Sequence, residues 1–206
     1  FLKQFLLHKN ALIGAVFVFF GLQSFAQDSA YYHTAFNSKD DSLKSKLHLI
    51  INNHVEFPYT SSSTDVWDIL KESDRDPNNP NNVILIYTGW SVDAAQEYNS
   101  GAGWTREHVW AKSHGDFGND NGPGTDLHHL RPTDASVNSS RGNLDFDWGG
   151  SVVTDGGIAT DNLKDSNSFE PRDEVKGDIA RMLFYMAIRY EGDDGYVDLE
   201  INDSVG

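Results

Sequence analysis

GWTREHVWAKSHGDFGNDNGPGTDLHHLRPTDASVNSSRGNLDFDWGG, residues 103–150, is the stretch from which the organisation of this chain can be read. Half of the eight histidines of the chain lie in it, with a glutamate, an asparagine and four cations nearby. Histidine, carboxylate, amide and cationic side chains are the groups needed for metal-assisted hydrolysis of a phosphodiester. The histidines are His108, His114, His128 and His129, and the cations are Arg106, Lys112, Arg131 and Arg141.

The same stretch predicts two strands and a helix. Residues 105–109 alternate as a β-strand does, and residues 126–130 predict a returning strand after the glycine-rich loop 114–124. Pro132 is expected to start a short helix, residues 133–139. This ββα unit would bring His108 close to Asn138. Because Glu107 and His108 are adjacent in a strand, a bulge or twist is needed for both to serve one site.

The residue types indicate how such a unit would work. A carboxylate on Glu107 and an amide oxygen on Asn138 are hard ligands suited to Mg²⁺, with Ca²⁺ or Mn²⁺ as alternatives. A neutral His108 can take a proton from the attacking water, and its other ring nitrogen should meet a carbonyl or side-chain acceptor. The cations expected to contact phosphate are Arg106, Lys112, Arg131 and Arg141.

Two further groups have more than one interpretation. In one interpretation, Asp126 and His128 form hydrogen bonds that orient the residues binding the metal ion. In the other, they are ordinary polar residues of a strand. Zinc at His114 and His129 is disfavoured, because partners at matching spacing are missing and the chain contains no cysteine.

Residues 1–26 have the pattern of a secretory signal peptide. Lys3 and Lys9 form a basic start, residues 11–22 are an apolar core, and Ala26 ends a small-residue cleavage site. The apolar core is shorter than the roughly 20 residues that a membrane-spanning helix needs. We therefore expect a secreted or periplasmic protein that leaves the membrane once the signal is removed.

The charge restricts the kind of partner. The net charge is −15, and the first 26 residues contain no acidic residue, so that the remainder is more negative still. General coating of nucleic acid is therefore disfavoured by repulsion. Phosphate binding has to be local, with clustered cations and a metal ion.

The rest of the chain predicts one α+β domain over residues 27–206. Helices are expected near residues 40–54, at 64–72 and at 170–190, a buried strand at 83–87, and a loop at 151–168 with a short strand at 151–153. Residues 73–82 read as a solvated turn. Asp74, Asp76 and Asn78 imitate the start of a calcium loop, but the glycine and glutamate that complete it are missing.

Three segments closely resemble the bacterial secreted endonuclease I family. They are REHVWAKSHG (106–115), GPGTDLHHLRPTDASVNSSRGN (122–143) and FEPRDEVKGDIARMLFYMAIRY (169–190). The resemblance runs from about Tyr31 to Gly195. It implies a mixed α/β fold with a ββα-metal (His-Me finger) motif flanked by helices, and a non-specific nuclease acting on DNA and often on RNA. It also implies His108 as general base, and Glu107 and Asn138 as direct metal ligands.

The chain departs from the family pattern in two ways. Members with a longer insertion between the two strands place a transition-state arginine there, whereas the loop 114–124 has none. Lys112, Arg131 and Arg141 are the alternatives, and the sequence does not choose among them. Chains of that family also continue well beyond the region matched by Asp198, so we expect a C-terminal truncation at residue 206.

The predicted function is a secreted, divalent-metal-dependent, sequence-non-specific endonuclease. Its expected partner is DNA, with RNA as a second possible substrate, and no obligate protein partner is expected. The alternative from another class is a secreted, calcium-stabilised binding module without catalysis. A phosphoesterase acting on small substrates is a third interpretation.

Overall fold

The computed structural model of the 206-residue chain describes residues 30–202 and 204. The expected signal peptide, residues 1–26, lies outside the described residues. Within them, no helix has both the length and the apolar character needed to cross a bilayer. The described residues form four α-helices and three small sheets in a mixed α+β domain, which confirms the expected fold class.

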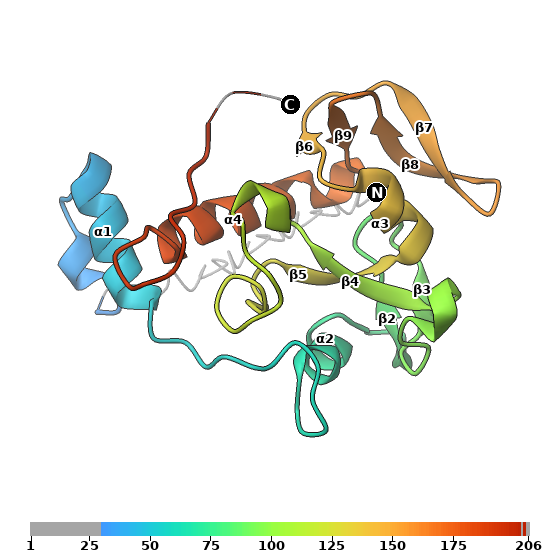
Figure 1. Ribbon diagram of the computed structural model, residues 1–206, viewed down its shortest axis with the longest axis horizontal. Helices are drawn as coiled ribbons and strands as arrows, with labels where there is room; N and C mark the ends of the chain where they lie inside the picture. Colours follow the sequence, from blue (N-terminus) through green and yellow to red (C-terminus); the bar gives the residue numbers. More distant parts are fainter. Residues whose placement is uncertain (1–29, 203, 205–206) are drawn as a thin grey trace, which may run out of the picture.

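An antiparallel two-stranded ribbon crosses the middle of the molecule (Figure 1) and continues directly into a helix. Its strands are β4 (Trp104–His108) and β5 (Leu130–Asp134), and the helix is α3 (Ala135–Arg141). The predicted ββα order is confirmed. The register pairs His108 with Leu130 and continues without a bulge to Trp104.

The predicted bounds of the second strand and of the helix were wrong. Residues 126–129 form a turn, because the carboxylate of Asp126 accepts the backbone N–H of His128 at 2.8 Å and closes it. Pro132 lies inside β5, where its carbonyl accepts the backbone N–H of Ile86. Helix α3 begins later, where the side chain of Asp134 accepts the first free backbone N–H groups.

Helix α4 (Asp173–Arg189) lies above the ribbon in Figure 1 and runs along much of the long axis of the molecule. It lies within the range predicted for a helix, 170–190, and buries one apolar side, as its spacing predicts. That side packs against Val109 beyond β4 and Val137 of α3. The helix therefore supports the ββα unit through apolar packing. Its buried apolar residues are Val175, Ile179, Met182, Met186 and Ala187.

Below the ribbon in Figure 1, α2 (Val66–Ser73) leads into an antiparallel sheet of order β1-β2-β3. The strands are β1 (Arg75–Asp76), β2 (Asn79–Ile84) and β3 (Ser91–Asp93). The predicted strand at 83–87 was therefore placed too late, since residues 85–87 are a buried turn beyond β2. Residues 73–82, expected as a solvated turn, contribute β1 and most of β2 instead.

The two ends of the molecule hold the remaining elements. Helix α1 (Asp40–Ile51), within the predicted helix, packs on α4 at one end. At the other end lies a four-stranded sheet of order β6-β9-β8-β7. Its hairpin was missed in the loop predicted at 151–168, because two of the buried residues of β8 are polar, Thr160 and Asn162. The strands are β6 (Asp145–Phe146), β7 (Ser151–Asp155), β8 (Ile158–Lys164) and β9 (Ser168–Glu170), and the short 3₁₀ turns are η1 (His33–Ala35), η2 (Asn99–Gly101) and η3 (Lys112–His114).

Candidate active site

His108, the last residue of β4, is held in a single orientation. Its Nε2 lies 3.0 Å from the carbonyl oxygen of Gly124. Because a carbonyl can only accept, Nε2 carries the proton and donates, which leaves Nδ1 as a proton acceptor. The expected acceptor for the second ring nitrogen is thereby confirmed. Tyr59 stacks on the ring, with 5.7 Å between centroids and 23° between planes, and His129 packs beside it at 5.6 Å.

The surroundings of His108 keep its ring neutral. The residue is 8% exposed. Burial, then the neighbouring His129 and the cations Lys112 and Arg106, lower the pKa of His108 to about 3, against the hydrogen bond to Gly124. At neutral pH the imidazole is uncharged, with a lone pair on Nδ1, which is the state that a general base requires.

The loop that supplies the Gly124 carbonyl is tightly closed. A Cβ atom added at Gly124 would lie 2.3 Å from the carbonyl oxygen of Gly118 and 2.9 Å from that of Asp120. Both are main-chain atoms, so the loop would have to move to accommodate a methyl group. Gly124 is therefore required for a close approach of two backbone segments.

We expect Gly124→Ala to lower the activity that depends on His108 by at least about tenfold, because a shift of its carbonyl on the order of 1 Å misorients the ring. Gly118→Ala is the matched control, since a Cβ there meets no atom closer than 3.9 Å. Initial rates of the two variants, compared at equal folded fraction by circular dichroism, check this. Equal rates would show that the carbonyl does not set the ring orientation.

Glu107 leaves the ribbon on the opposite face from His108, because the strands pair without a bulge. Its Oε1 accepts the hydroxyl of Tyr87 at 2.5 Å and lies 3.3 Å from the guanidinium of Arg141. Its Oε2 makes no ion pair or side-chain hydrogen bond with a described residue. The two side chains flank the end of the ribbon, where Arg141 contacts both residues.

The carboxylate of Glu107 is buried, with 2% of the residue exposed. Burial raises its pKa, while Arg141 and the hydroxyl of Tyr87 act in the opposite direction. The raised pKa means that Arg141 and Tyr87 offset only part of the cost of burying the negative charge. A bound cation would stabilise the charged form further. In Glu107, Oε1 is held by Tyr87 and Arg141, and Oε2 has no side-chain partner among the described residues. This arrangement is expected of a carboxylate that binds a metal ion while neighbouring side chains fix its orientation.

Asn138 lies on α3, three residues before Arg141, so the two side chains emerge from neighbouring positions on the helix. Its side chain is half-buried and forms no hydrogen bond with any residue in the described part of the chain. An amide oxygen and a free carboxylate oxygen fit a hard divalent cation. Across residues 30–202 and 204, no three His, Asp or Glu side chains form a cluster able to hold a metal ion.

Two of the four cations expected to contact phosphate are buried. Arg141 is 2% exposed and donates to the carbonyl oxygens of His108, at 3.2 Å, and Val109, at 2.8 Å. Arg106 is 9% exposed and lies over the Tyr59 ring, 3.4 Å from its centroid. It also donates to the carbonyl oxygen of Tyr59. Both guanidinium groups therefore hold parts of the site in place.

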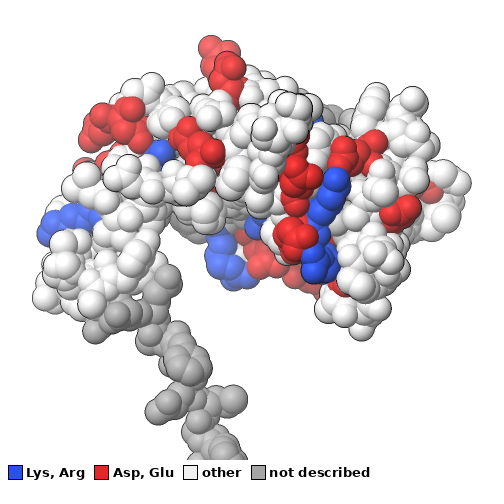
Figure 2. Space-filling view, turned by 90° about the horizontal axis from the view of Figure 1, so that it is seen from below, with Lys and Arg blue, Asp and Glu red and all other residues white. Residues whose placement is uncertain are grey.

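The other two cations are more accessible. Lys112, in η3, donates to the side chain of Asn119 at 2.9 Å. Arg131, opposite Glu107 in the ladder, donates to the carbonyl oxygens of Leu127 and Leu130. On the face shown in Figure 2, blue Lys and Arg side chains lie beside red Asp and Glu side chains, without one continuous positive patch.

Asp126 faces α4 instead of His108. Its Oδ2 accepts the hydroxyls of Tyr190 at 2.8 Å and Tyr185 at 3.0 Å, while His128 bonds to its Oδ1. Burial alone would raise the pKa of Asp126, but the hydrogen bonds from His128 and the nearby His129 lower it well below its usual value. This buried carboxylate thus fastens the turn before β5 to α4.

The carboxylates that imitate a calcium loop already have partners in the fold. Asp74 lies 3.8 Å from the guanidinium of Arg131. Asp76 accepts the hydroxyl of Ser91 at 2.5 Å and the backbone N–H of Asn78 at 2.8 Å, which closes the β1–β2 turn.

Several residues of the site were absent from the sequence interpretation, above all Tyr59 and Tyr87. Tyr87 is 20 positions from the carboxylate that it contacts, and Tyr59 is 47 positions from Arg106. Neither tyrosine stands in a recognisable motif, so no local signal could have identified them.

Comparison with known proteins gives matches over most of the chain. The model of the Endonuclease I family matches residues 40–196. An extracellular ribonuclease of Bacillus subtilis (strain 168) is 57% identical over 182 residues, and one of Bacillus amyloliquefaciens is 56% identical over 181. Each alignment covers 88% of this chain but only 61% or 60% of the relative, so the chain spans about three fifths of their length. No solved structure matches the chain.

Proposed function

Since the chain belongs to the Endonuclease I family, we propose that it is a secreted nuclease that uses a divalent cation to hydrolyse phosphodiester bonds in RNA and DNA, without sequence specificity. Secretion is supported by the signal-like residues 1–26 and by the names of the two extracellular relatives. The single observation that carries the chemistry is the orientation of His108 by the carbonyl of Gly124.

In this proposal His108 is the general base. Its Nδ1 accepts a proton from the water that attacks phosphorus, and Nε2–H keeps its hydrogen bond to Gly124 throughout. Burial holds the ring neutral before the reaction. Tyr59, which stacks beside the imidazole and is itself covered by Arg106, helps to keep the ring in the orientation set by Gly124.

Glu107 and Asn138 would hold the cation. Because their oxygen atoms are hard ligands, the proposed cation is Mg²⁺. When bound, such an ion stabilises the negative charge that develops on the phosphate oxygens and on the leaving oxygen. Tyr87 and Arg141 fix the Glu107 carboxylate. Lys112 and Arg131 are the proposed phosphate contacts, while Arg106 and Arg141 act as positioning residues. Asp126 and His128 stabilise the turn that precedes β5.

The proposed nucleophile is water, so the reaction does not need a ribose 2′-hydroxyl. This supports activity on both RNA and DNA. The names of the two relatives support RNA as a substrate, and the name of the family does not restrict the sugar.

To test this, one RNA and one DNA oligonucleotide of the same sequence are incubated with the purified chain and Mg²⁺, and cleavage of each is measured. We expect cleavage of both, loss of cleavage in EDTA, and no cyclic phosphate ends on the RNA products. RNA products with 2′,3′-cyclic ends and an uncut DNA would show that the nucleophile is the 2′-hydroxyl. Binding of Ca²⁺ without any cleavage would favour the non-catalytic binding module.

Asn138→Ala is expected to raise the Mg²⁺ concentration for half-maximal cleavage by at least about tenfold, because half of the proposed protein ligand set is removed. Asn143→Ala is the control, an exposed amide just beyond α3 that bonds to Ser113. Cleavage rates measured across a Mg²⁺ titration give both values. An unchanged midpoint for Asn138→Ala would remove Asn138 from the metal site.

A further inference from the structure

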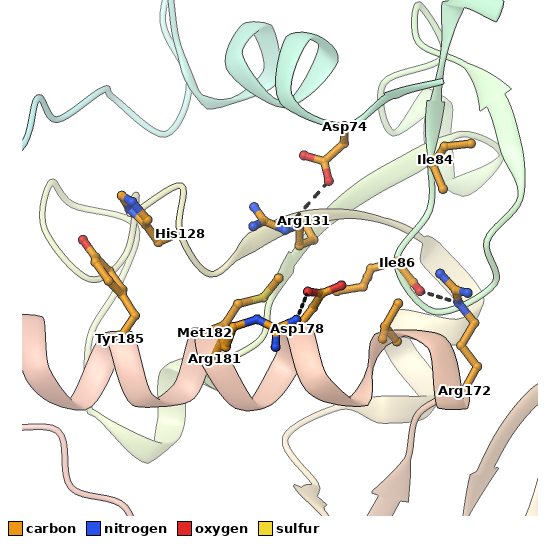
Figure 3. Close-up of a pocket in the computed structure, with 11 residues that line it drawn as sticks. Asp74, Ile84, Ile86, His128, Arg131, Arg172, Asp178, Arg181, Met182 and Tyr185 are labelled. Atoms are coloured by element: carbon orange, nitrogen blue, oxygen red, sulfur yellow. Dashed lines mark hydrogen bonds and ion pairs between the residues drawn. The ribbon is translucent and has the colours of Figure 1, made fainter. Parts of the chain in front are cut away.

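A groove lies between α4 and the strands β2 and β5, and apart from Arg131 and His128 its lining residues have no role in the proposed catalysis. Its cavity is about 440 Å³, within the roughly 300–1,000 Å³ typical of small-ligand sites. In Figure 3, His128 and Tyr185 lie at one end, Arg172 at the other, and Arg131 and Arg181 between them. The groove therefore combines an aromatic end with a line of guanidinium groups.

The lining of the groove contains three arginines and two aspartates, which is a small excess of positive charge in an acidic chain. Three of the seven arginines line it, in a chain of net charge −15. Two of these arginines pair with exposed acids: Arg181 with Asp178 at 2.5 Å and Arg172 with Glu174 at 3.4 Å. Arg131 lies 3.8 Å from the less exposed Asp74. Exposed ion pairs of this kind contribute little to stability, so exchange of a carboxylate for a phosphate costs little.

The aromatic end is a stacked pair. The rings of His128 and Tyr185 lie 4.1 Å apart with 19° between their planes. Hydrogen bonds to the carboxylate of Asp126 fix both rings. The His128 side chain is 58% exposed, so the pair presents a ring to solvent. Fixed, exposed rings next to cations are the elements with which proteins bind single-stranded nucleic acid.

We propose that this groove binds one strand of the nucleic acid substrate, with phosphates on Arg131, Arg172 and Arg181 and a base stacked on the His128–Tyr185 pair. The inference rests on the proposed nuclease function and adds that the substrate is held single-stranded.

The groove borders the β4–β5 ribbon that carries the proposed metal ligand Glu107. Arg131 is paired with Glu107 in the β4–β5 ladder, and opposite residues of an antiparallel pair project from the same face. A strand whose phosphodiester lies at Glu107 can therefore continue past Arg131. From Arg172 to Tyr185 the helix extends roughly 20 Å, at about 1.5 Å per residue. This length spans several nucleotides, since each step of a duplex strand rises about 3.4 Å along the axis.

The test measures binding with the full chain carrying His108→Ala, so that the probe is not cut. Fluorescence anisotropy of labelled single-stranded RNA, single-stranded DNA and a duplex of the same sequence gives Kd at several salt concentrations. We expect both single strands to bind more tightly than the duplex. Arg181→Ala should lower the slope of log K against log salt by about 0.7, the value for one phosphate contact on a single strand.

Arg75→Ala is the matched control for Arg181→Ala. Both arginines are exposed and pair with an acid three residues earlier: Arg75 with Glu72, and Arg181 with Asp178. Arg75 lies outside the groove. The control should leave Kd and slope unchanged. For the base platform, His128→Ala should raise Kd by at least about fivefold, and His128→Phe should restore it because the ring is kept.

The outcomes separate this inference from the proposed function. If the chain with His108 intact cleaves nucleic acid, but Arg181→Ala and His128→Ala bind as tightly as their parent, the groove inference is overturned and the nuclease stands. Tighter binding of the duplex also overturns it. If no nucleic acid is cleaved, the proposed function fails, whatever the binding measurements show. If His128→Phe binds as weakly as His128→Ala, stacking is not the role of the pair.

Discussion

Replacing His108 with alanine is expected to lower the rate of phosphodiester cleavage by about 10²–10⁴-fold, the usual contribution of a general base. The buried ring, neutral and hydrogen-bonded to Gly124 through Nε2, leaves Nδ1 as the proton acceptor. Phosphate charge can be shared among several cations, but a proton needs one acceptor in the right place. Single-turnover rates at saturating Mg²⁺ measure the effect.

His114→Ala is the control for this experiment. His114 belongs to the same sequence window but has 35% of its side chain exposed and lies 3.2 Å from Asp145, outside the environment of His108. Its substitution should leave the rate unchanged. Partial recovery of His108→Ala by added imidazole would support proton transfer as the lost step. A rate within threefold of the parent would contradict the assignment of the base.

Asp126→Ala is expected to cause the largest loss of stability, on the order of 3–5 kcal/mol in the free energy of unfolding. The carboxylate is 2% exposed and accepts the hydroxyls of Tyr185 and Tyr190, which would both lose their buried partner. For a chain of this size the midpoint of thermal unfolding should fall by roughly 6–20 °C. Circular dichroism measures it, and Asp120→Ala, at an exposed position of the preceding loop, is the control.

The same carboxylate predicts a dependence of stability on pH. Because the folded protein holds the pKa of Asp126 below the unfolded value of about 3.9, the charged form stabilises the fold. This contribution is present above the unfolded pKa and is lost as pH falls through the folded pKa. The stability difference between the parent and Asp126→Asn should therefore be constant near pH 7 and shrink below about pH 4. A difference that does not change down to pH 2 would show that the charge of Asp126 contributes nothing.

The sequence was informative where the signal is local. Alternation of residue types predicted β4, and the apolar spacing of residues 170–190 predicted α4, because one apolar face is visible in a short window. The bounds of β2 and β5 could not be read in the same way. Strand β2 ends where its ladder with β3 ends, and β5 begins where the Asp126 turn closes. Both limits depend on contacts with other segments.

The candidate site shows the same limit. His108, Glu107 and Asn138 could be proposed because their residue types and order match a known chemistry. The roles of Arg106 and Arg141 could not, since a guanidinium on the surface and one bonded to buried carbonyls have the same local sequence. Arg141 meets its partners His108 and Val109 across 33 and 32 positions. Only the folded chain shows that these cations hold the site together.

The partner that orients His108 is a main-chain atom, and this affects how the site can be mapped genetically. Substitution cannot delete the carbonyl oxygen of Gly124; it can only displace it, because every residue type carries the same group. A library of side-chain truncations would therefore leave the orienting group in place at every position it samples. In such a map, substitutions at position 124 would lower activity because they add volume. The map would not show that the lost activity depends on a hydrogen bond to the main chain.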